Sequence, residues 1–177
     1  MIEVGKLYKS NPAIDLTTKE NLALRTEVRD TALGEGQPAS NKAAVDEAFK
    51  VLSTGGLGTV GFDDLYGIAF DPTYEKTYAK AQARAKTELA RADRSKMSPA
   101  LAVFMDLHAA VNGPCGGIKA LLDRAGEKGD ERTLNLLRPL TAPRVQGHWK
   151  KQDLLGCIHE GSLNKAISDI EARVKKR

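Results

Sequence analysis

Cys115 is the side chain of this sequence with the strongest case for covalent chemistry. It follows the helix-breaking residues 112–114 and precedes a run with helical periodicity, so we expect it in the first turn of a helix. The helix dipole and the free backbone amides lower the pKa of a thiol placed there. A nucleophilic cysteine also needs a base and an orienting group. The available partners are His148, His159, Asp153 and Asn164, of which His148 and Asp153 are the candidates for a site with Cys115. A small cysteine-dependent enzyme is therefore one hypothesis, and a small buried cysteine at a helix start is its alternative.

A zinc site is the next chemistry that the cysteines and histidines suggest. Four side chains are available as ligands: Cys115, His148, Cys157 and His159. Structural zinc sites hold close pairs of ligands on one local turn, as in C-x2-C or H-x3-H. The spacing Cys157-x-His159 does not match, and the other two residues lie far away in the sequence. We therefore predict no metal site and no cofactor.

The segment from Gly56 to Gly61 matches the pattern G-x-G-x-x-G, which in dinucleotide-binding proteins lies between a strand and a helix. Here the preceding residues, 45–52, have the periodicity of an amphipathic helix, and no β-α-β unit surrounds them. We therefore expect these glycines to serve a turn rather than to bind phosphate.

A row of cations suggests a charged partner. The spacings of 4, 4 and 7 residues place four basic side chains on one face of a helix predicted from Pro72 to about Arg94. Such a row can lie along a phosphate backbone or an acidic protein surface, and the alternative is an ordinary solvated face. The four candidate binding residues are Lys76, Lys80, Arg84 and Arg91.

The elements that must position these side chains are helices. Aromatic residues make up only 5% of the chain, and residues 98–125 predict two buried helices joined by a Gly-Pro turn. We expect an all-α fold: one compact domain over residues 1–177 with about six or seven helices, an extended arm at 1–16 and a small irregular or β-like insertion near 55–70. The expected core comprises Val45, Phe49, Leu52, Leu101, Phe104, Met105, Leu121, Leu122, Leu137, Ile167, Ile170 and Val174.

The second half of the chain contains a short internal sequence similarity, called the internal echo below. Residues 119–123 recur in similar form at 165–169, an offset of 46 residues that suits helical repeat arrays. The stretch Gly129-Asp130-x-Arg132-Thr133-Leu134, followed by Leu137 and Pro139-Leu140, resembles the helix openings of HEAT-like repeats. It is also similar to helical segments attached to some bacterial serine/threonine kinases. This resemblance spans residues 98–177 and implies a helical surface that binds another macromolecule.

Composition limits the setting in which the chain works. The formal net charge is +4, residues 1–9 lack the apolar region of a signal peptide, and no apolar run reaches the ~20 residues that span a bilayer. Two cysteines are too few for a disulfide framework, so we expect a reduced, cytoplasmic protein, with one bond between them left open. No membrane partner is expected.

The polar side chains do not converge at known catalytic spacings. We therefore favour a non-catalytic helical module or adaptor that binds an unidentified protein partner. The alternatives are a nucleic-acid-binding protein that uses the basic helix face and an enzyme that uses Cys115.

Overall fold

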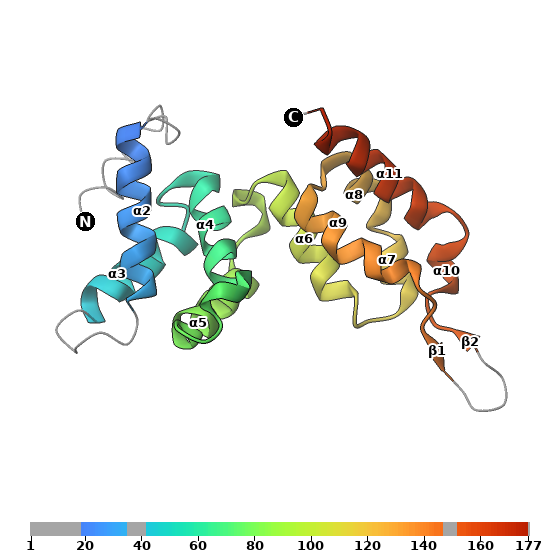
Figure 1. Cartoon of the computed structure of the whole chain (residues 1–177), viewed down its shortest axis with the longest axis horizontal. Coiled ribbons are helices and arrows are strands. Elements are labelled where there is room, and N and C mark those ends of the chain that lie inside the picture. Colours follow the sequence, from blue (N-terminus) through green and yellow to red (C-terminus); the bar gives the residue numbers. More distant parts are fainter. Residues whose placement is uncertain (1–18, 35–41, 147–151, 177) are drawn as a thin grey trace. The chain divides into compact units, whose positions relative to one another are not determined.

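The computed structural model describes residues 19–34, 42–146 and 152–176 (Figure 1). Helices dominate, which confirms the expected all-α fold class. Contacts divide the chain into two compact units, Met1–Ser98 and Pro99–Arg177, and each is described by itself. The single domain expected from the sequence remains a prediction, and the expected arm at 1–16 lies outside the described residues.

Over its described residues, 19–34 and 42–98, the N-terminal unit contains four longer helices with short 3-10 turns between and after them. The closest packing joins α4 to α5 and α2 to α3. The elements are α2 (Lys19–Leu33), α3 (Lys42–Ser53), α4 (Gly58–Phe70), η2 (Pro72–Tyr74), α5 (Ala79–Arg91) and η3 (Arg94–Lys96).

Helix α4 replaces the irregular or β-like insertion that the sequence suggested near 55–70. Phe62, Leu65 and Ile68 recur every third residue and are fully buried, so α4 contributes one face to the core. The alternation of polar and apolar residues around Phe62 resembles a strand locally, but packing against α3 and α5 favours the helix.

The glycines before and within α4 serve the connection from α3, as expected. Gly55 has a φ of +79°, a left-handed conformation that glycine adopts without the steric penalty of a side chain. An added Cβ at Gly61 lies 3.2 Å from the carbonyl oxygen of Leu52, so this glycine permits α3 and α4 to approach closely.

The long helix expected from Pro72 to about Arg94 is divided. Asp71 accepts a hydrogen bond of 2.8 Å from the backbone N–H of Thr73, which starts η2 instead of a continuous helix. Helix α5 begins only at Ala79. Lys76 therefore precedes the helix that was expected to carry it.

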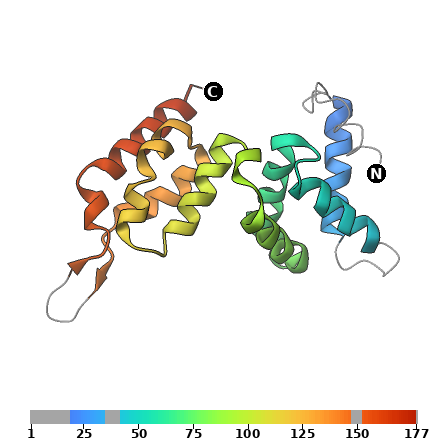
Figure 2. The same cartoon turned by 180° about the vertical axis from the view of Figure 1, so that it is seen from behind.

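The C-terminal unit is built around two longer helices, α6 and α11, with shorter helices packed against them. Helix α6 packs against α8 and α9, and α11 lies along α8 and also contacts α9 (Figure 2). The elements are α6 (Pro99–Ala110), α7 (Cys115–Lys119), α8 (Leu122–Lys128), α9 (Glu131–Leu137), η4 (Arg138–Thr141), β1 (Val145–Gln146), β2 (Gln152–Asp153), α10 (Gly156–His159) and α11 (Ser162–Val174).

Most of the expected core is confirmed. Every residue predicted to be buried is buried except Leu121, Ile167 and Val174, which are partly buried against the C-terminal core. The internal echo, in contrast, does not correspond to one repeated structure. Residues 119–123 span the end of α7 and the start of α8, whereas residues 165–169 lie inside α11.

A disulfide between Cys115 and Cys157 joins α7 to α10. The two Cα atoms are 6.2 Å apart, and 42 residues separate the cysteines in sequence. The expectation of reduced cysteines is therefore wrong for this structure, and the bond that the sequence left open is present.

The side chain of Arg173 closes the end of α8. From α11, its guanidinium donates hydrogen bonds to the carbonyl oxygens of Gly126 (2.8 Å), Glu127 and Gly129 (2.9 Å). The last carbonyl groups of a helix have no partner within the helix, so this arginine satisfies groups that α8 leaves open. The cation also lies at the negative end of the α8 dipole.

Replacing Arg173 with methionine keeps the apolar stem and removes these donors. We expect Arg173→Met to lower the free energy of unfolding of the C-terminal unit by about 2 kcal/mol, because each carbonyl oxygen loses a charge-assisted hydrogen bond. Urea denaturation followed by circular dichroism measures the change. The control is Lys176→Met, which makes the same kind of change at an exposed site just after the end of α11. Equal stability of the two variants would contradict this capping role.

Candidate functional site

The residues of the predicted thiol site have other partners in the structure. The Cys115 sulfur is bonded to Cys157 and is not a free thiol. The Asp153 carboxylate interacts with His159 Nδ1 at 2.6 Å, and His148 lies outside the described residues. A cysteine nucleophile needs a thiolate, so the disulfide-bonded chain offers no such group at position 115.

The predicted row of cations is not one continuous charged face. Arg84 Nη1 lies 2.6 Å from Asp46 Oδ1, and its guanidinium stacks 4.3 Å from the centre of the Phe49 ring. Lys80 and Arg91 are exposed on α5, while Lys76 is exposed in the turn before this helix. Arg84 therefore joins α5 to α3 rather than presenting its charge to a partner.

The described parts of the chain contain neither a metal site nor a membrane-spanning helix. No group of three or more His, Cys, Asp or Glu side chains there is arranged to hold a metal ion. Within the same residues, no helix is long and apolar enough to cross a membrane.

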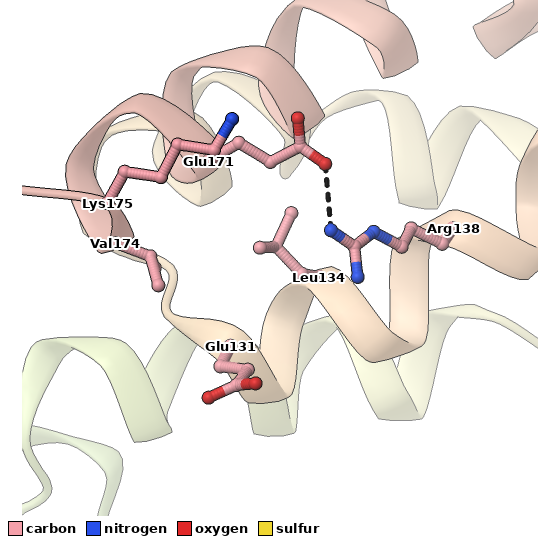
Figure 3. Close-up of a pocket in the computed structure, with 6 residues that line it drawn as sticks. All are labelled: Glu131, Leu134, Arg138, Glu171, Val174 and Lys175. Carbon is pink, nitrogen blue, oxygen red and sulfur yellow. Dashed lines mark hydrogen bonds and ion pairs between the residues drawn. The ribbon is translucent and has the colours of Figure 1, made fainter.

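A groove of about 240 Å³ opens between α9 and α11 in the C-terminal unit (Figure 3). Leu134 from α9 and Val174 from α11 supply its apolar surface. Leu134 is only 3% exposed, whereas Val174 is partly exposed, so the last turn of α11 is not fully covered by its neighbours. Charged side chains surround this surface: Glu131, Arg138, Glu171 and Lys175.

Helical spacing explains why these six residues share one groove. On α9 and the turn that follows it, Glu131, Leu134 and Arg138 are three and four residues apart. At the end of α11, Val174 and Lys175 follow Glu171 by three and four residues, so all three lie on the same side of the helix. Each helix therefore presents one apolar side chain between charged ones.

The two ends of the groove differ in their electrostatics. Arg138 Nη2 lies 2.8 Å from Glu171 Oε1, and the hydrogen bond from Arg138 lowers the pKa of Glu171. This pair closes one end and largely cancels its own charge (Figure 3). The Glu131 carboxylate points away from this pair, and both Glu131 and Lys175 are exposed. They leave one charge of each sign at the rim.

Sequence reasoning did not identify this groove. It assigned Leu134 and Val174 to apolar stripes, which predicts burial but does not show where a neighbouring helix stops covering them. The available signal was the position of Val174 in the last turn of α11, between Glu171 and Lys175. A helix end is where a covering layer is most often incomplete.

Comparison with known proteins finds no matching protein family, no matching curated protein and no matching solved structure.

Proposed function

We propose that the chain is a non-catalytic helical interaction module that binds a protein partner through the α9–α11 groove. The observation that supports this proposal is a groove in which the partly exposed Val174 lies beside the buried Leu134, with charged residues of both signs around them. Apolar grooves between helices are a recurrent docking surface for peptide segments, whose apolar anchors give affinity while the polar rim gives orientation.

The size of the groove favours one apolar side chain as its occupant. Its volume of about 240 Å³ is below the range of about 300–1,000 Å³ typical of small-molecule and cofactor sites. A leucine or phenylalanine side chain from a partner segment fits this space. The exposed charges of Glu131 and Lys175 suit a segment in which a basic and an acidic group flank that residue.

Nucleic acid binding, the first alternative, receives less support. The groove includes Glu131 and Glu171, which repel phosphate, and Arg84 on α5 is already paired with Asp46. Lys80 and Arg91 stay available as exposed cations, so this alternative predicts that Lys80→Glu with Arg91→Glu abolishes a salt-sensitive interaction.

The disulfide bears on the cytoplasmic location expected from the sequence. Disulfides persist in oxidising compartments, whereas cytosolic ones are usually transient. A cytoplasmic location is compatible with the proposal when Cys115–Cys157 cycles between the bonded and the reduced state. An oxidising compartment is the simpler setting for a permanent bond.

A substitution that fills the groove tests the proposed function. We expect Val174→Arg to reduce capture of a specific partner from lysate of the source organism by at least tenfold, because a long charged side chain occupies the apolar space. Ala172→Arg introduces the same side chain on an exposed part of α11 outside the groove and is expected to retain the partner.

Captured proteins are compared by quantitative mass spectrometry after nuclease treatment, and circular dichroism verifies that both variants fold. A partner retained by the wild type and Ala172→Arg but lost with Val174→Arg supports the groove. Proteins that bind all three forms equally would overturn the proposal. Partners that disappear with nuclease would favour the nucleic acid alternative.

A further inference from the structure

Both ring nitrogens of His159 face hydrogen-bond acceptors. Nδ1 lies 2.6 Å from Asp153 Oδ2, and Nε2 lies 2.8 Å from the backbone carbonyl oxygen of Leu140. A carboxylate and a carbonyl accept hydrogen bonds and donate none. A neutral imidazole carries one N–H, so it satisfies one of these contacts and places a lone pair against the other acceptor. The imidazolium carries two N–H groups and satisfies both.

These two contacts join three segments of the C-terminal unit. His159 is the last residue of α10, Leu140 belongs to η4 and Asp153 belongs to β2. The other carboxylate oxygen of Asp153 accepts hydrogen bonds from the backbone N–H groups of Arg144 (3.1 Å) and Leu155 (3.0 Å). Asp153 therefore holds the base of the β1–β2 pair, and His159 connects that base to the helices.

Within the described ranges, Asp153 is the charged group that contacts the His159 ring. From α7, Lys119 lies 3.9 Å from Glu160, the next residue after His159, so this pair balances its own charge. Arg144 directs its guanidinium to the carbonyl oxygen of Val111 at 3.2 Å. From α11, the neutral hydroxyl of Ser162 bonds the carbonyl oxygen of Ile158. The protonation state of His159 therefore depends mainly on Leu140 and Asp153.

We propose that His159 is a proton-dependent latch, which holds the β1–β2 pair against η4 and α10 while its imidazole is protonated and releases it when the proton is lost. The hydrogen bond to the Leu140 carbonyl, followed by that to Asp153, raises the pKa of His159. The backbone N–H of Leu155 is the first cause that lowers the pKa of Asp153, which keeps it ionised at neutral pH.

The sign of the pH dependence follows from these two shifts. A raised pKa means that the stabilisation by His159 is fully present below about pH 6.5, its unfolded value, and is lost as the pH rises through the folded pKa. The stabilisation by Asp153 is present above its unfolded pKa of about 3.9 and is lost as the pH falls through its lowered folded value. The latch is therefore closed in weakly acidic solution and opens on the alkaline side.

The test uses the full-length chain with its disulfide intact. A pH titration of the histidine ring signals by NMR is expected to give a midpoint above 6.5 for His159, and Asp153→Asn is expected to lower it. Hydrogen exchange then reports on the latch through the amide of Leu154, which donates to the Arg144 carbonyl at 2.9 Å. We correct the protection of this amide for the intrinsic effect of pH on exchange. Between weakly acidic and alkaline solution, the total loss of protection is expected to be about tenfold for each pH unit by which the His159 midpoint exceeds 6.5.

His159→Gln removes the titrating group, so its Leu154 protection is expected not to depend on pH. His108→Gln changes an exposed histidine on α6 and is expected to keep the wild-type profile. A His159 midpoint at or below 6.5 overturns the proposal, as does the same pH profile in wild type and His159→Gln. If His159→Gln does not fold, the proposal is tested by the His159 midpoints of the wild type and of Asp153→Asn, which are expected to differ as stated above.

Discussion

Reduction of the Cys115–Cys157 disulfide is expected to lower the free energy of unfolding of the C-terminal unit by about 4 kcal/mol. The bond closes a loop in which 42 residues separate the two cysteines, so it removes many conformations from the unfolded chain. It also joins α7 and α10, two helices that are too short to be stable alone. Urea denaturation followed by circular dichroism, with and without a reductant, measures the loss.

The double substitution Cys115→Ser with Cys157→Ser separates the bond from other effects of the reductant. We expect it to reproduce the loss and to make stability insensitive to reductant. The N-terminal unit contains neither cysteine, so its unfolding transition is the internal control. A C-terminal transition that reductant leaves unchanged would show that packing of α10 alone sets the stability.

The parts of the fold that sequence predicts well are those in which one local signal determines the outcome. Helix α6 is the clearest case, since its apolar run around Phe104 and Met105 predicts a helix buried on most sides, and both residues are buried. The N-terminal signal Ser98-Pro99 also predicts its first residue correctly. Periodicity and capping are properties of neighbouring residues, so no knowledge of the fold is required.

Helix α4 shows where local signals fail. Its three glycines and its aromatic and β-branched residues disfavour a helix when considered alone. In the structure, Phe62 and Leu65 are fully buried, and burial of this face outweighs the unfavourable propensity. The stabilisation from this burial depends on α3 and α5. The sequence of residues 55–70 alone therefore does not reveal it.

The candidate sites depend on contacts between distant residues, and this is why sequence alone did not identify them. Spacing left open whether Cys115 and Cys157 are bonded, and it did not indicate that Asp153 contacts His159. The groove residue Val174 has the pattern of a core position. What distinguishes it is the incomplete cover by a neighbouring helix, which is a property of the tertiary structure.

The second large effect is expected at Asp64 in the N-terminal unit. Asp64 on α4 is only 7% exposed, and both of its carboxylate oxygens accept hydrogen bonds from the guanidinium of Arg25 on α2. The hydrogen bond with Asp64 is the main cause of the raised pKa of Arg25, so this guanidinium stays charged over the whole physiological range. We expect Asp64→Ala to lower the free energy of unfolding by about 3 kcal/mol, because it leaves a partly buried guanidinium without its counter-ion. Urea denaturation of the N-terminal unit measures the change.

Two comparisons separate this explanation from simple loss of a side chain. Asp46→Ala removes the partner of Arg84, but Asp46 is 50% exposed, so we expect a cost below about 1 kcal/mol. Replacing both members, Arg25→Met with Asp64→Leu, removes the unpaired charge and is expected to cost less than Asp64→Ala alone. These two outcomes would show that the loss of stability in Asp64→Ala comes from the buried, unpaired charge of Arg25 rather than from the lost attraction between the two side chains. Equal losses from Asp64→Ala and Asp46→Ala would contradict this, because burial is the physical difference that distinguishes the two ion pairs.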